Sequence, residues 1–174
     1  STGNPKVLVI PVNLDSDNKT DKLLNDIETV FNGTSEETGY ESVKTYYQKS
    51  SYGKLNIEFN VMKEWFTPKR NKRYYEYYYD DDTYADGSTK ILQEALAYFD
   101  NKINYSDYDL NNDDYIDSVW LIYNCDVDFE GDSIYWAFTF WDYSDNLYDG
   151  KYANYYAFAG TDFMDPNVNI DESY

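Results

Sequence analysis

The apolar residues of this chain follow two different periods in irregular order, and that pattern constrains the fold more than any other feature. Short apolar or alternating runs predict strands, whereas apolar residues three and four positions apart predict helices. Because the two kinds of segment do not alternate regularly, we expect an α/β or α+β domain in three layers, with a mixed twisted sheet packed against helices. The expected strands are 7–12, 55–61, 118–124, 135–140 and 155–159, and the expected helices are 23–31, 43–50 and 91–103.

The expected helices carry recognisable terminal signals. Thr20 or Asp21 can cap the first helix, and Gly33 is placed where a left-handed residue commonly ends one. Asp86 or Ser88 can cap the third helix. The charged, tyrosine-rich segment 69–86 has no clear period, so we expect a solvated surface loop there. With no repeat and no linker, residues 1–174 are expected to form a single domain.

Composition narrows the function classes. The formal net charge is -19, from 33 acidic and 14 basic residues, and such a chain repels both nucleic acid and anionic membrane surfaces. It favours calcium, which binds carboxylate oxygens. Aromatic residues make up 20% of the chain, with 22 tyrosines, which favours a folded domain. Cys125 is the only cysteine and follows an apolar run, so a buried structural thiol is favoured over a nucleophile.

An acidic segment carries the sharpest chemical signal. Asp109, Asn111 and Asp113 take positions 1, 3 and 5 of an EF-hand-type calcium loop, Tyr115 takes the carbonyl position 7, and Asp117 takes position 9. Two departures are evident, because Asp114 replaces the usual glycine and Trp120 stands in place of the bidentate glutamate. These residues predict a calcium site. The alternative is an acidic turn with side-chain caps and no ion.

Several segments, taken in order, resemble the N-terminal half of the catalytic domain of immune inhibitor A-like bacterial metallopeptidases. They span most of the chain. The resembling segments are Lys6-Val-Leu-Val-Ile-Pro-Val12, Tyr46-Tyr-Gln-Lys-Ser-Ser-Tyr-Gly-Lys-Leu-Asn-Ile57 with Trp65, Glu94 to Asp100, Asp107 to Asp117 running into Val119-Trp-Leu-Ile-Tyr123, Trp136-Ala137, and Tyr156-Ala-Phe-Ala-Gly160.

The resemblance implies a secreted bacterial zincin, in which a helix carrying His-Glu-x-x-His holds zinc and the glutamate acts as general base. In that family the helix follows the segment that resembles 156–165. The present chain has no histidine and ends at Tyr174, so we expect an inactive N-terminal part with no catalytic residue of its own. Zinc is expected only in a full-length parent.

The resemblance also implies an edge strand that docks substrate peptide by β-augmentation. The best candidate is 135–140, with Trp136, Ala137 and Phe138 as substrate-binding residues. The alternative is an ordinary sheet strand. A sheet without the active-site helix would expose an apolar face, so self-association is expected.

Two other functions stay open from the sequence. One is a non-catalytic, calcium-stabilised module that captures peptide or protein with a zincin-like fold. The other is an aromatic-rich carbohydrate-binding domain, for which Trp136 and Trp141 are the residues to substitute.

Overall fold

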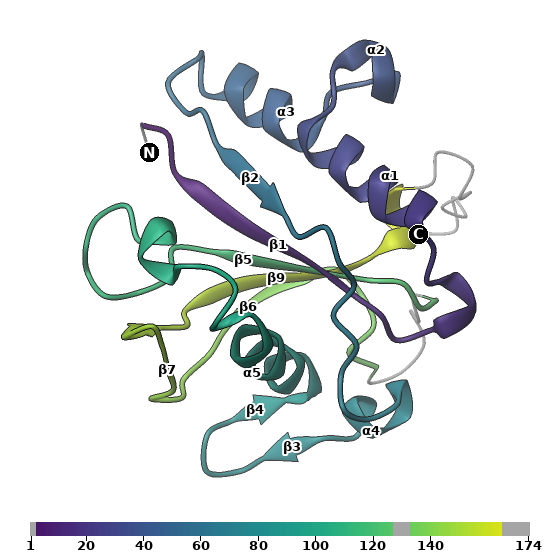
Figure 1. The fold of residues 1–174 in the computed structure, drawn as a ribbon, viewed down its shortest axis with the longest axis vertical. Coiled ribbons are helices and arrows are strands. Elements are labelled where there is room, and N and C mark those ends of the chain that lie inside the picture. Colours follow the sequence, from purple (N-terminus) through teal and green to yellow (C-terminus); the bar gives the residue numbers. More distant parts are fainter. Residues whose placement is uncertain (1–2, 127–132, 165–174) are drawn as a thin grey trace.

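The computed structural model describes residues 3–126 and 133–164, which form a mixed α/β arrangement (Figure 1). Residues 165–174, which lead toward the position where the resemblance places the active-site helix, lie outside the described part. The helices are α1 Asp21–Asn32, α2 Ser35–Thr38, α3 Val43–Ser50, α4 Lys72–Glu76 and α5 Gly87–Phe99. The strands are β1 Lys6–Val12, β2 Glu58–Val61, β3 Tyr79–Asp80, β4 Ala85–Asp86, β5 Val119–Tyr123, β6 Phe138–Trp141, β7 Leu147–Tyr148, β8 Lys151–Tyr152 and β9 Tyr155–Gly160.

The main sheet has five strands in the order β2-β1-β5-β9-β6. The first four strands run parallel to one another, and β6 runs antiparallel to β9. The prediction of a mixed sheet packed against helices is therefore confirmed. In the described residues, β6 has no partner on its outer side, so it is an edge strand of this sheet.

Two apolar clusters hold the layers together, one on each face of the sheet. Alternate residues of a strand point to opposite faces, so β1 contributes to both. Leu8 and Ile10 pack with α5 in one cluster, whereas Val7 and Val9 pack with α1 in the other. In Figure 1, α5 lies on one side of the sheet, and α1 and α3 lie on the opposite side.

The helix caps agree with the sequence except at one glycine. The Thr20 side chain accepts a hydrogen bond from the Leu23 amide at the start of α1, and Asp86 accepts one from the Thr89 amide at the start of α5. Gly33 does end α1, but the prediction of a left-handed residue was wrong, because its backbone is extended at φ -66° and ψ 166°. Its amide still reaches back to the Thr29 carbonyl at 2.7 Å.

Segment 69–86 was expected to be a loop, and this was wrong. It contains α4 and the β3–β4 hairpin, which packs beside the beginning of α5. Tyr75 anchors the segment, since it is fully buried and its hydroxyl donates to Glu94 Oε2 at 3.0 Å. None of the helices in the described residues is long and apolar enough to cross a membrane.

Candidate functional site: the acidic loop and the edge strand

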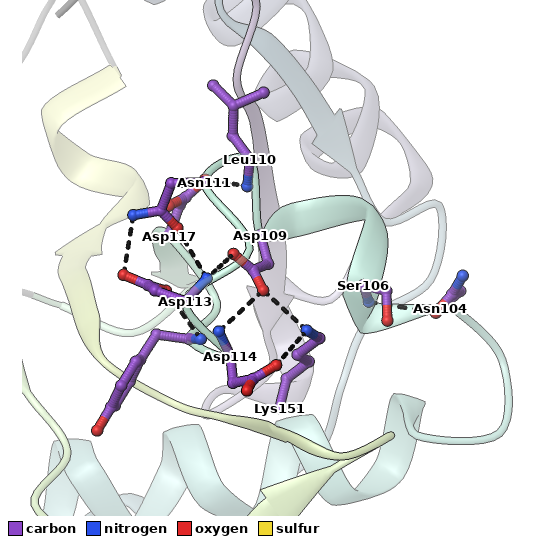
Figure 2. A network of polar contacts seen from close by, with 10 residues as sticks. Asn104, Ser106, Asp109, Leu110, Asn111, Asp113, Asp114, Asp117 and Lys151 are labelled. Carbon is purple, nitrogen blue, oxygen red and sulfur yellow. Dashed lines mark hydrogen bonds and ion pairs between the residues drawn. The ribbon is translucent and has the colours of Figure 1, made fainter.

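The acidic loop lies between a short 3-10 helix at Tyr105–Tyr108 and β5, and it folds around Asp109 (Figure 2). Asp109 is buried, and its two oxygens accept hydrogen bonds from the Asp113 amide at 3.1 Å and the Asp114 amide at 3.1 Å. Asp117 closes the loop by accepting from the Leu110 amide at 2.9 Å. The carboxylates at positions 1 and 9 therefore order the backbone of the turn.

The remaining residues also fit an EF-hand-type turn in their backbone conformation and burial. Asp114 has φ 69°, the left-handed conformation expected where glycine usually stands. Ile116 is fully buried, as the inward position predicts. Asn111 and Asp113 are exposed, and the Asn111 side chain donates to Asp113 Oδ2 at 2.8 Å. Tyr115 donates its amide to Asp113 Oδ1 at 3.0 Å.

A lysine that sequence reasoning missed completes the loop. Lys151 of β8 places its ammonium 2.8 Å from Asp109 Oδ2 and 2.8 Å from Asp114 Oδ1 (Figure 2). The hydrogen bond from Lys151, followed by those from the Asp113 and Asp114 amides, lowers the pKa of Asp109 below its usual value, so this carboxylate stays ionised. Lys151 therefore supplies positive charge at the first position of the loop.

The β7–β8 hairpin holds this lysine in place. The Ile116 amide donates to the Tyr152 carbonyl at 2.9 Å, and the Tyr152 amide donates to the Asp114 carbonyl at 2.8 Å. The Tyr115 and Tyr152 rings also contact each other, with centroids 5.5 Å apart. The spacing of residues 109–117 does not predict this hairpin, because Lys151 lies 42 positions after Asp109 in the sequence.

The side chains of the loop offer carboxylate and amide oxygens, which are the type of ligand that calcium prefers. In the described part of the chain, however, no three or more His, Cys, Asp or Glu side chains are gathered as a metal-holding group. Trp120, at the twelfth position, packs its ring on Phe31 and Phe59, on the α1 side of the sheet. Calcium binding stays a prediction, and an ion on Asp109 would compete with Lys151.

Zinc fits these residues poorly. Hydrolytic zinc sites take imidazole ligands, and the chain has no histidine. Cys125 is buried, and this burial raises the pKa of its thiol to about 12, so the thiolate that binds metal or attacks substrate is disfavoured near neutral pH. The interpretation of Cys125 as a structural thiol agrees with this environment.

The three residues proposed to bind substrate fall at the beginning of the edge strand, not within it. The strand was expected at 135–140, but β6 begins three residues later, so of Trp136, Ala137 and Phe138 only Phe138 lies in it. The preceding chain bends, because the Trp136 amide donates to the Ile134 carbonyl at 3.0 Å. Tyr135 is fully buried, and its hydroxyl donates to the Lys72 carbonyl at 2.6 Å.

The register of β6 shows which backbone groups face outward. The Asp142 amide donates to the Asn154 carbonyl at 3.1 Å, in the same register that pairs Phe140 with Tyr156 and Phe138 with Phe158. Because bonded and non-bonded pairs alternate in an antiparallel ladder, the amide and carbonyl groups of Thr139 and Trp141 point away from β9. These groups form an unpaired hydrogen-bonding edge in the described residues.

Exposed aromatic side chains surround this edge. Trp136, Trp141, Tyr143 and Tyr155 are all well exposed, and the Trp141 ring contacts the rings of Tyr143 and Tyr155 with centroids 5.3 and 6.0 Å away. Self-association was expected from a bare apolar face of the sheet, not from these edge aromatics, and that expectation stays a prediction.

A scan against protein-family models matched no family, and a search of the curated proteins found no relative of this chain.

Proposed function

We propose that this chain is the N-terminal, sheet-bearing part of the catalytic domain of a secreted bacterial zinc endopeptidase, of the zincin kind and similar to immune inhibitor A. Its own role in that enzyme is to dock the substrate peptide along β6. The observation that carries the proposal is an antiparallel strand at the edge of a mixed sheet, with outward backbone groups at Thr139 and Trp141. An extended peptide adds a strand to such an edge by main-chain hydrogen bonds.

In this proposal the chain contributes binding and order, and the chemistry comes from residues elsewhere in the parent enzyme. A zinc ion in that enzyme would activate the water that attacks the peptide bond. Docking along β6 would hold the peptide extended, which reduces the entropy lost on reaching the transition state. The acidic loop would bind calcium and stabilise the end of the sheet where β5 begins.

A second candidate function is a non-catalytic peptide- or protein-binding module with the same fold. It is favoured by the lack of histidine in the chain. Both candidates use the β6 edge, so a docking experiment tests what they share, and only the presence or absence of a zinc motif in the parent separates them. The carbohydrate-binding alternative instead requires glycan binding that is lost when Trp136 or Trp141 is substituted.

Thr139→Pro tests the docking edge. Proline has no backbone N–H, so the substitution removes the amide hydrogen at position 139. That hydrogen points away from β9, so the hydrogen bonds between β6 and β9 are kept. We expect the affinity for an extended probe peptide, acetyl-Thr-Val-Arg-Val-Thr-amide, to fall about tenfold, from one lost hydrogen bond and the steric bulk of the ring. Titration followed by tryptophan fluorescence measures the affinity, and circular dichroism checks the fold.

Thr139→Val is the matched control, because it keeps the amide and favours a strand equally well. It should bind the probe as the unaltered chain does. Equal affinity in the proline variant, or no binding of the probe to the unaltered chain, would argue against docking at β6.

Lys151→Met tests the calcium loop. The substitution keeps an apolar stem and removes the ammonium from Asp109 and Asp114, so a calcium ion no longer competes with it. We expect calcium to bind about tenfold more tightly, and to raise the melting temperature more than it does for the unaltered chain. Calorimetric titration with calcium chloride and thermal melts with and without chelator measure both effects.

Lys102→Met provides the control for the change in net charge. Lys102 pairs with the exposed carboxylate of Glu64 at 2.7 Å, and it forms no ion pair with the acidic loop in the described part of the chain. The calcium affinity of the Lys102→Met variant should equal that of the unaltered chain. If neither the unaltered chain nor the Lys151 variant binds calcium at millimolar concentration, the loop is an acidic turn closed by lysine.

A further inference from the structure

A cavity of about 1020 Å³ opens beside the end of β6. Three parts of the chain line it: the β3–β4 hairpin, the first turns of α5, and the segment from Phe140 to Asn146. Its size is at the upper end of the range of small-molecule pockets. The hairpin that forms one wall belongs to the segment that the sequence pattern marked only as a surface loop.

The lining combines carboxylates with aromatic rings. The lining has four aspartates and one lysine, so negative side chains outnumber positive ones by three. They are Asp80, Asp82, Asp86 and Asp145, with Lys90. The rings of Tyr78, Tyr84, Phe140 and Tyr143 supply apolar walls. Flat rings with nearby carboxylates are the surroundings that hold an alkylammonium or a guanidinium group.

One cation already lies against an aromatic ring of the cavity, and two carboxylates of the lining have no ion-pair partner among the described residues. The Lys90 ammonium already lies 5.6 Å from the centroid of the Tyr78 ring. Asp86 is engaged as the cap of α5, and Asp80 accepts a hydrogen bond from the Asp82 amide at 3.0 Å. Asp82 and Asp145 are exposed and form no ion pair with another described residue.

The register of β6 directs a docked peptide toward this cavity. Phe138 and Phe140 pack against the cluster on the α5 side of the sheet, so their side chains point to that face. Residues opposite each other on neighbouring strands point to the same face. The peptide residue beside Phe140 therefore projects its side chain toward α5, where the cavity lies.

We propose that this cavity is a specificity pocket that takes the basic side chain, lysine or arginine, of a peptide docked along β6. The proposal rests on the docking function proposed above and adds to it the chemical class of the preferred substrate residue. Asp82 and Asp145 would pair with the cation, and the rings of Tyr78 and Phe140 would cover its apolar stem.

The test compares two peptides that differ only in charge: acetyl-Thr-Val-Arg-Val-Thr-amide and the same peptide with citrulline in place of arginine. Citrulline keeps the shape and loses the charge. We expect the unaltered chain to bind the arginine peptide about tenfold more tightly. In the double variant Asp82→Asn with Asp145→Asn, that preference should disappear while the citrulline peptide keeps its affinity.

The control is the double variant Asp17→Asn with Asp81→Asn, which changes net charge equally at two exposed residues that do not line the cavity. It should retain the preference for arginine. Equal binding of both peptides by the unaltered chain would overturn the pocket and leave docking at β6 intact. No binding of either peptide would overturn both. A preference that the control variant loses equally would show long-range attraction by net charge and would also overturn the pocket.

Discussion

Alkaline unfolding of this chain should be abrupt, beginning near pH 10, where tyrosine in an unfolded chain ionises. Burial is the largest influence on seven buried tyrosines, and it raises the pKa of each above its ordinary value. They are Tyr75, Tyr105, Tyr108, Tyr123, Tyr135, Tyr148 and Tyr156.

The sign follows from proton binding. Between the unfolded and folded pKa values the folded chain keeps these phenolic protons and the unfolded chain has lost them, so stability falls as pH rises. Each tyrosine contributes about 1.4 kcal/mol per pH unit, and seven together contribute up to about 10 kcal/mol per unit. A domain with a total stability of roughly 5–15 kcal/mol should therefore unfold within about two pH units above 10.

The measurement follows tyrosinate absorbance and circular dichroism together as pH is raised. We expect a large part of the absorbance change to appear in the same step as the loss of structure. Tyr123→Phe is an informative variant, because the Tyr123 hydroxyl is buried without a hydrogen-bond partner among the described residues. It should shift the transition to higher pH and make it less steep. A gradual rise in absorbance with the dichroism unchanged would contradict the prediction.

Gly87→Ala should strongly destabilise the fold, because it adds a methyl group where the beginning of α5 meets α4. A Cβ at Gly87 would lie 1.8 Å from the Tyr75 carbonyl oxygen and 2.5 Å from its carbonyl carbon. These are backbone atoms of α4, so no side-chain rotation relieves the clash. We expect a loss of about 3 kcal/mol or more, and a fall in melting temperature of roughly 6–12 °C.

The same substitution at Gly39 is the control. Gly39 has φ +74° with nothing within 4 Å of the added atom, so only the backbone conformation is strained, at roughly 1 kcal/mol. Thermal melts of the two variants beside the unaltered chain make the comparison. A Gly87 variant that melts at the temperature of the unaltered chain would mean that α4 does not press on the beginning of α5.

The sequence predicted those strands and helices in which buried apolar residues recur at a regular spacing. Val7 to Val12 and Val119 to Tyr123 are apolar runs in the sheet interior, and the spacing of Ile91, Leu92 and Ala95 fixes the buried face of α5. Such periods arise from burial itself, so they can be read without knowledge of distant contacts.

The elements and contacts that the sequence did not predict depend on tertiary structure. The hairpins β3–β4 and β7–β8 have two-residue strands, too short to show a period. The run that begins at Tyr135 has strand-forming residues, but β6 begins only at Phe138, and the Tyr135 hydroxyl donates to the Lys72 carbonyl instead. In the candidate site, the spacing of Asp109 to Asp117 predicted the turn, and only the fold brought Lys151 to it.

The coding sequence of the parent gene beyond codon 174 is the decisive test of the proposal that this chain is the sheet-bearing part of a zinc peptidase. If the proposal is right, the reading frame continues and encodes His-Glu-x-x-His shortly afterwards, on a segment with helical spacing. A reading frame that ends without that motif would rule out a zinc peptidase of this kind. The chain would then be a binding module, and the proposed zinc chemistry would be withdrawn.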